Sequence, residues 1–232
     1  MAFKYKDVVP WGRSYDEYLR MFDLTETELR LKILGCGDGP AAFNSECNKR
    51  GGHVTSVDPI YNLTREEIRK RIDETYADVL GQTEMNREKF RWDEIKSVDE
   101  LGKLRMEAME LFLDSYEQGR KEKRYIPASL PDLPLLDGEF DIALSSHFLF
   151  LYTDNLSYDF HLRSIREMLR VAKEVRIFPL LEVNANRSPY IERIIEELGP
   201  GGIEVRKVNY EFQIGGNEML IIKNPHGGKA SR

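Results

Sequence analysis

A glycine-rich turn between two short apolar runs constrains the fold of this chain more than any other feature. The segment Leu31–Pro40 reads LKILGCGDGP, with glycines at Gly35, Gly37 and Gly39, and the next apolar run, HVTSV, ends in Asp58. Glycines allow a tight strand-to-helix turn against whose bare backbone a ligand can lie. An acidic residue at the end of the following strand is placed to accept hydrogen bonds from both hydroxyls of a ribose. The sequence therefore predicts a nucleoside site on an α/β sheet.

The spacing of these glycines narrows the choice of nucleoside. It is Gly-x-Gly-x-Gly, whereas a dinucleotide fingerprint reads Gly-x-Gly-x-x-Gly. Pro40 follows the last glycine and Asp38 lies inside the loop, so a pyrophosphate would meet negative charge where it needs free N–H groups. These residues favour an adenosine with a neutral or cationic tail. The alternative is a glycine-rich turn in an unrelated α/β protein.

At this point the chain resembles the class I S-adenosylmethionine-dependent methyltransferases. The resemblance covers most of 31–223, with 62–124 outside it, and rests on the glycine loop and the acidic end of the second strand. Ile33 stands where the family often has an acidic residue. The resemblance implies S-adenosylmethionine as cofactor and S-adenosylhomocysteine as product. It also implies cofactor contacts from Gly35, Cys36, Gly37, Gly39, Asp58 and Pro59.

Apolar runs alternate with helical patterns as a parallel sheet requires, so the predicted fold class is α/β. We expect one domain over 1–232, with a doubly wound, mostly parallel seven-stranded sheet of the Rossmann-like methyltransferase type, closed by an antiparallel pair near the C-terminus. Strands are expected over 31–35, 53–57, 140–146 and 174–181, and helices over 13–23, 40–49, 158–171 and 188–198, the last with Ser188 as its N-cap.

Three segments lie outside this alternation. Residues 62–124 are strongly charged, with apolar residues at helical spacing, and exceed what one connection needs. We predict a helical insertion of two or three helices there, between strands two and three. It is either a lid near the cofactor or a solvated decoration. Residues 1–30 are expected to form an N-terminal helical cover and 224–232 a disordered tail.

The segment 124–141 carries a second cluster of motifs. Leu-Pro-Leu at 133–135 and Gly-Glu-Phe-Asp at 138–141 match the layout of the resembled family before its fourth strand. The match implies that Ser129 and Leu130 lie beside the adenine, where the family uses an oxygen acceptor and an apolar wall. Asp is common in the family at the position of Ser129. The alternative is an ordinary proline-rich loop.

Three polar residues, Ser145, Ser146 and His147, end the strand predicted over 140–146. They fall at the carboxyl edge of the sheet, where open α/β sheets bind ligands. Ser145 and Ser146 are candidate cofactor contacts. Methyl transfer requires an aligned acceptor, exclusion of water and sometimes removal of a proton. His147 is the candidate base, because an unperturbed imidazole titrates at about pH 6.5; the alternative is a structural histidine.

Arg13 precedes the glycine loop on the expected N-terminal helix. In similar enzymes an N-terminal helix folds over the cofactor, so Arg13 is a candidate partner of the methionine carboxylate. The alternative is a surface arginine on a capping helix.

Composition limits the classes of partner. The net charge of -6, with 41% hydrophobic and 32% charged residues, gives no general attraction to nucleic acid or to a membrane. No apolar run reaches the ~18 residues of a membrane span. Cys36 and Cys47 lack the spacing of a metal site or of a disulfide framework. We expect a cytoplasmic protein without a metal; the oligomeric state is left open.

Three functions remain open. The first, which we expect, is a methyltransferase that acts on a small molecule. The second is an RNA or protein methyltransferase, supported only by the basic run RKEKR at 120–124. No Asn-Pro-Pro-Tyr or Asp-Pro-Pro-Tyr tetrapeptide follows strand four, which argues against methylation of base amino groups. The third is a nonenzymatic S-adenosylmethionine-binding protein, motivated by Ile33 and Ser129.

Overall fold

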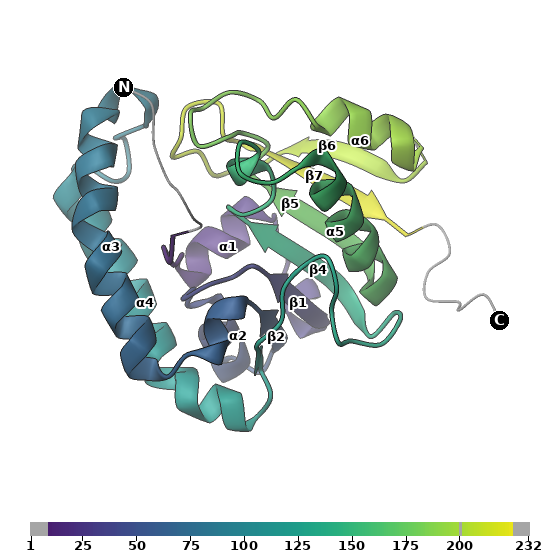
Figure 1. Cartoon of the computed structure of the whole chain (residues 1–232), viewed down its shortest axis with the longest axis horizontal. Coiled ribbons are helices and arrows are strands. Elements are labelled where there is room, and N and C mark those ends of the chain that lie inside the picture. Colours follow the sequence, from purple (N-terminus) through teal and green to yellow (C-terminus); the bar gives the residue numbers. More distant parts are fainter. Residues whose placement is uncertain (1–8, 200, 225–232) are drawn as a thin grey trace.

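The computed structural model describes residues 9–199 and 201–224. They form one seven-stranded sheet with helices on both faces (Figure 1). The strands are β1 (Lys32–Cys36), β2 (His53–Val57), β3 (Tyr125–Ile126), β4 (Phe140–Ser146), β5 (Ala172–Phe178), β6 (Ile203–Lys207) and β7 (Glu218–Lys223). The helices are α1 (Tyr15–Met21), α2 (Phe43–Lys49), α3 (Arg65–Met85), α4 (Val98–Lys121), α5 (Tyr158–Val171) and α6 (Ile191–Leu198).

The strand order is β3-β2-β1-β4-β5-β7-β6. Neighbouring strands are parallel except at β7, which runs antiparallel to both β5 and β6. The predicted fold class is therefore confirmed, including the antiparallel pair near the C-terminus. The strands β2 and β4 and the helix α5 have the predicted bounds.

The order of the strands reverses at β1 and opens a crevice there. Gly35 of β1 pairs with Ser56 of β2 on one side and with Leu144 of β4 on the other. The chain leaves β1 toward β2, whereas β4 is reached only after the connection through β3. The connections at the carboxyl ends of β1 and β4 therefore diverge, which is where ligands bind in open α/β sheets.

Alternating residues of the strands bury two separate apolar faces. Ile33 packs with residues of α1 and α2, including Tyr18 and Phe43, whereas its neighbour Leu34 packs with Ile165 of α5. This alternation follows from the two-residue period of a strand. It fixes the doubly wound arrangement, with α1 and α2 on one face and α5 and α6 on the other.

The predicted helical segment between β2 and β3 consists of α3 and α4, which lie side by side along one edge of the sheet (Figure 1). Thr64 and Glu67 form a capping box at the start of α3, and Ser97 caps α4. Ile72 of α3 and Phe112 of α4 belong to one apolar cluster with Tyr61, which follows β2, and Tyr125 of β3. The insertion is therefore packed onto the β3 edge of the sheet.

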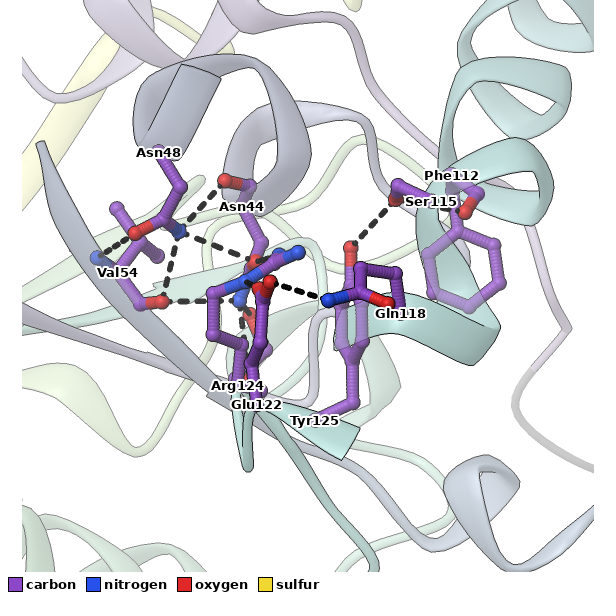
Figure 2. Close-up of polar contacts among 10 residues, drawn as sticks. Asn44, Asn48, Val54, Phe112, Ser115, Gln118, Glu122, Arg124 and Tyr125 are labelled. Carbon is purple, nitrogen blue, oxygen red and sulfur yellow. Dashed lines mark hydrogen bonds and ion pairs between the residues drawn. The ribbon is translucent and has the colours of Figure 1, made fainter. Parts of the chain in front are cut away.

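A polar network ties the end of α4 to α2 and β2 (Figure 2). Arg124 Nη1 donates to Asn44 Oδ1 at 2.7 Å, and Asn44 Nδ2 donates to the carbonyl of Val54 at 3.2 Å. Asn48 Nδ2 donates to the same carbonyl at 2.9 Å, and Arg124 Nε donates to Glu122 at 2.6 Å. Arg124 of the basic run at 120–124 therefore lies in a structural network.

Several predicted boundaries are wrong. The helices predicted over 13–23 and 40–49 span Tyr15–Met21 and Phe43–Lys49, the strand predicted over 31–35 spans Lys32–Cys36, and β5, predicted from 174, begins at Ala172. The helix predicted from 188 begins at Ile191, and its N-cap is Tyr190 rather than Ser188. The hydroxyl of Ser188 instead accepts the N–H of Tyr190 at 3.4 Å and lies 2.8 Å from Thr153 Oγ1. The strand predicted to reach 181 ends at Phe178, because Pro179 has no N–H to continue the ladder.

Parts of two predictions concern residues outside the described ranges. These are 1–8 of the expected N-terminal cover and, except for Asn224, the expected tail at 224–232. Within the described ranges, no helix is long and apolar enough to cross a membrane.

Candidate functional site

A cavity of about 690 Å³ lies at the carboxyl ends of β1, β2 and β4. The glycine loop and Asp58 form one part of its lining. The rest of the lining, which we call the chamber, comes mainly from the insertion, from the loop after β4 and from the segment before β7. The residues that line the chamber are Leu63, Arg71, Val79, Thr83, Phe90, Leu101, Arg105, Phe148, Leu151, Tyr152, Phe160, Val183, Phe212 and Gln213.

Two glycines of the loop line the cavity in a conformation that other residues rarely adopt. Gly37 has φ +71° and Gly39 has φ +52°. A Cβ at Gly37 would come within 2.8 Å of the Phe148 ring, whereas a Cβ at Gly39 would meet no atom within 4 Å. Gly39 therefore presents bare backbone to open space, as the predicted close approach of a ligand requires.

Asp58 follows β2 and lines the cavity with Pro59. Its Oδ1 accepts the N–H of Ile60 at 2.8 Å, and its Oδ2 accepts the N–H of Gly39 at 2.9 Å. Burial raises the pKa of Asp58 to about 6, against these two hydrogen bonds, which favour the ionised form. Each oxygen keeps a lone pair for a further donor.

The side chain of Asp38 points from the glycine loop into the protein interior. Tyr18 Oη donates to its Oδ1 at 2.9 Å and Ser56 Oγ donates to its Oδ2 at 2.6 Å. Burial, and to a lesser degree the charge of Asp58, raises the pKa of Asp38 to about 6. Its carboxylate lies over Gly35, where any Cβ would collide with Oδ2. Gly35 thus accommodates Asp38, a packing requirement that the sequence pattern did not reveal.

The predicted adenine contacts also reach the cavity. Ser129 and Leu130 line it together with Ala128, from the loop that follows β3. Leu130 is 6% exposed, so it offers an apolar wall. Ser129 forms an isolated bridge with Asp132, which turns the loop at this point.

His147 lines the cavity directly after β4 and has a positive φ of 51°. Its backbone N–H donates to the carbonyl of Phe178 at 2.7 Å, and its ring Nδ1 lies 3.0 Å from Ser146 Oγ. Burial, and then the charges of Arg13 and Arg105, lower the pKa of His147 well below its usual range. The ring is therefore neutral at pH 7, able to accept a proton but weakly basic.

Three predicted site residues are not among those that line the cavity. Gly35 lies under Asp38, and the side chains of Cys36 and Ser145 are fully buried in the sheet at 0% exposure. The hydroxyl of Ser145 has no partner among the described residues. The sequence pattern placed these residues correctly at the carboxyl edge of the sheet. It did not distinguish the side chains that face the cavity from those buried within the sheet.

The N-terminal segment crosses the cavity before α1. Val9 N–H donates to Tyr152 Oη at 3.2 Å, and the ring of Trp11 packs on Tyr76 of α3 at 5.7 Å between centroids. Arg13 lines the cavity and donates from Nη1 to the carbonyl of Trp11 at 2.6 Å. Its buried Nε has no partner in the described part of the chain. Burial, followed by repulsion from Arg105, lowers the pKa of Arg13.

Arg105 of α4 is a cavity residue that sequence reasoning missed. It is 1% exposed, and its Nη1 and Nη2 donate to the two oxygens of Glu17 at 2.6 and 2.7 Å. Tyr210 Oη also donates to Glu17, at 2.8 Å. Burial alone would raise the pKa of Glu17, but the charge and hydrogen bonds of Arg105 lower it to about 2. No local pattern links residues 88 positions apart.

The tip of the insertion, residues 87–94, closes the far end of the chamber. Phe90 forms an isolated antiparallel bridge with Gln213, and Arg91 N–H donates to the carbonyl of Phe212 at 2.7 Å. The rings of Phe90 and Phe212 stack with centroids 4.9 Å apart. Ion pairs join Arg91 to Glu211 and Arg20 to Glu94 around this contact. The insertion is therefore docked over the cavity.

Comparison with known proteins places the chain in a family. It is 40% identical over 222 residues to the uncharacterized protein MJ0045 of Methanocaldococcus jannaschii, and the match spans 94% of this chain and 97% of that protein. The chain belongs to the MJ0045 family. No model of a described protein family matches the sequence.

Solved structures similar to this MJ0045-family chain are named as S-adenosylmethionine-dependent methyltransferases, the family that the sequence resembles. Magnesium protoporphyrin IX methyltransferase of Synechocystis PCC 6803, with bound cofactor, has a TM-score of 0.45 and 10% identity over 89% of this chain and 76% of its own. A methyltransferase of Aquifex aeolicus has a TM-score of 0.41 and 17% identity over 90% and 87%.

The described residues contain no group of three or more His, Cys, Asp or Glu side chains arranged to hold a metal ion.

Proposed function

We propose that this chain is an S-adenosylmethionine-dependent methyltransferase whose acceptor is a small molecule. One observation carries the proposal: a single cavity of about 690 Å³ is lined both by the glycine loop with Asp58 and by the largely apolar residues of the chamber. A nucleoside site alone would explain a binding protein. A cavity whose lining extends beyond the glycine loop and Asp58 leaves room for an acceptor, which favours an enzyme over a nonenzymatic binding protein.

The residues present fit the cofactor at four points. The open backbone at Gly39 accommodates a nucleoside, and Asp58 keeps acceptor capacity for ribose hydroxyls. The buried Nε of Arg13 has no partner among the described residues, and a carboxylate such as that of the methionine moiety would satisfy it. Leu130 supplies an apolar wall for the adenine. When bound, S-adenosylmethionine supplies an electrophilic methyl group on a sulfonium that is also the leaving group.

The chain itself has three tasks in this reaction. The N-terminal segment 9–13 and the insertion exclude water from the cavity. The chamber walls align the acceptor, which is where positioning contributes to the rate. His147 accepts a proton from the acceptor where the reaction releases one. Because the pKa of His147 is low, this role suits an acceptor whose proton is itself acidic.

Two contacts beside the chamber favour a small acceptor over RNA or protein. Tyr152 accepts the N–H of Val9 and holds the N-terminal segment, and Phe90 holds the insertion against Gln213. An acceptor that fits within the cavity of about 690 Å³ binds without breaking these contacts. The basic run at 120–124, which motivated the macromolecular alternative, is not among the cavity-lining residues, and its Arg124 is engaged with Asn44 and Glu122.

Calorimetric titration with S-adenosylmethionine, S-adenosylhomocysteine and NAD tests the proposal. We expect micromolar binding of the two sulfur nucleosides and no heat from NAD. Silence from both sulfur nucleosides would refute the proposed cofactor. Binding of both without methyl transfer to any member of a broad acceptor panel would favour the nonenzymatic alternative.

A further inference from the structure

We propose that the methyl acceptor is an acidic, largely apolar small molecule whose anionic group binds Arg71 at the rim of the chamber. This inference rests on the proposed methyltransferase function and adds the class of its substrate. It follows from the distribution of charge along the cavity, from Arg71, which forms no salt bridge within the described ranges, and from the apolar walls of the chamber.

The charged groups that line the cavity are distributed unevenly. Asp38 and Asp58 are the acidic residues among the described lining residues, and both lie at the glycine loop. Both accept hydrogen bonds from protein donors. The chamber is lined by Arg71 and Arg105 and by no acidic side chain of the described ranges. A cationic acceptor would meet only positive charge there, and an anion would meet complementary charge.

Arg71 is available for such a contact. It lies on α3, is exposed, and forms no salt bridge within the described ranges. Glu67, one turn earlier on α3, has its pKa lowered chiefly by hydrogen bonds from Thr64 and to a lesser degree by the charge of Arg71. Its carboxylate is engaged in the capping box, where it accepts the N–H of Thr64 at 2.8 Å. The guanidinium can therefore offer paired N–H donors to a carboxylate.

Two further lining residues, Arg13 and Arg105, are cationic. Both lie close enough to His147 that their charges lower its pKa. Glu17 compensates Arg105 by two hydrogen bonds but does not itself line the cavity. A protonated amine in this position would be repelled, and the chamber offers no carboxylate to take its proton.

The remaining walls are apolar and favour a hydrophobic body for the acceptor. Val79 comes from the same helix as Arg71, two turns further on, and Leu101 comes from α4. Phe90 and Phe212 stack across the far end. An acid with a planar or branched hydrocarbon body would thus bury its apolar surface here while its anion stays at the rim.

Three matched probes test the inference: 2-naphthoate, the neutral 2-naphthamide and the cationic 2-naphthylmethylamine. Each is titrated into protein saturated with S-adenosylhomocysteine. We expect the acid to bind about tenfold more tightly than the amide, as one charge-assisted hydrogen-bonded contact provides, and the amine to bind weakest. Equal affinities, a preference for the amine, or no binding of the acid would overturn the inference.

Two exposed cations of α3 provide a matched pair of variants. Arg71→Gln should reduce the preference for acid over amide to less than about threefold while leaving amide affinity unchanged. Lys70→Gln removes the same charge from the neighbouring position, which does not line the cavity, and should leave the preference intact. An equal effect of both variants would show a general charge effect and refute a contact at Arg71.

The same experiment separates this inference from the proposed function. If S-adenosylhomocysteine does not bind, the proposed cofactor fails. If it binds and the acid shows no preference, only the acceptor class fails. If the acid binds free protein but is displaced by S-adenosylhomocysteine, the arginines serve the carboxylate of the cofactor, and the inference is overturned.

Discussion

Replacing Asp58 by Asn tests the ribose contact with the smallest change of shape. In the structure Asp58 accepts N–H groups from Ile60 at 2.8 Å and from Gly39 at 2.9 Å, and each oxygen keeps a lone pair. The amide nitrogen of Asn can accept neither an N–H nor a hydroxyl. Loss of charge-assisted hydrogen bonds to both hydroxyls should weaken cofactor binding by about 2–4 kcal/mol, a ratio of Kd values of roughly 30 to 1,000.

The pKa of Asp58, about 6, adds a pH dependence with a definite sign. Two hydroxyl donors stabilise the ionised carboxylate, so cofactor affinity should rise with pH through about 6 and level off above about 7. Below pH 6 one proton must leave for each cofactor bound, which predicts up to about tenfold weaker binding per pH unit. Asp58→Asn removes this titrating group and should flatten the profile.

Asp38→Asn is the matched control, because the pKa of Asp38 is also about 6 while its oxygens face Tyr18 and Ser56. The assay is calorimetric titration with S-adenosylhomocysteine from pH 5 to pH 8 at constant ionic strength, with circular dichroism to verify the fold. The Asp38 variant should keep most of the pH dependence. Binding by Asp58→Asn within threefold of the parent, or a flat profile only in the Asp38 variant, would refute the reasoning.

Three further predictions concern other parts of the site and the fold. Gly37→Val should abolish cofactor binding and lower the melting temperature, because its Cβ would lie within 2.8 Å of Phe148 at a positive φ; normal calorimetric binding would place the loop away from the ligand. His147→Ala should leave cofactor affinity within about twofold and lower methyl transfer by roughly 10²–10⁴ once an acceptor is known; a collapse of affinity would make His147 a binding residue. Arg124→Ala should lower the free energy of unfolding by about 1–3 kcal/mol, since it removes the donor to the buried Asn44, with cofactor affinity retained; unchanged urea denaturation would show that the network contributes nothing.

The sequence by itself determined the sheet and the position of its binding edge. Short apolar runs bounded by glycine and charged residues predicted β2 and β4 at their observed bounds, and the periodicity of α5 did the same for that helix. The glycine loop and Asp58 were expected to meet, and a hydrogen bond from Gly39 to Asp58 joins them. These features depend on backbone conformation and on residues within one or two elements, so local pattern is sufficient.

Only the tertiary structure decided which side chains line the site. Gly35 proved to accommodate Asp38, and Ser145 and Cys36 are buried within the sheet, because a strand end presents alternate side chains to opposite faces. Whether the insertion is a lid or a decoration was open; the structure docks it over the cavity through Phe90 and Gln213.

The charged residues of the chamber and their partners likewise come together only in the folded protein, so their arrangement could not be predicted from the sequence. Arg105 and Glu17 are separated by 88 positions, and Tyr210 reaches Glu17 across 193. Neither separation leaves a periodic signal in the sequence, because such contacts are set by how whole elements pack rather than by the residues beside them. A sequence pattern records the conformation of each segment, whereas the field inside a cavity is the sum over segments that only packing brings together.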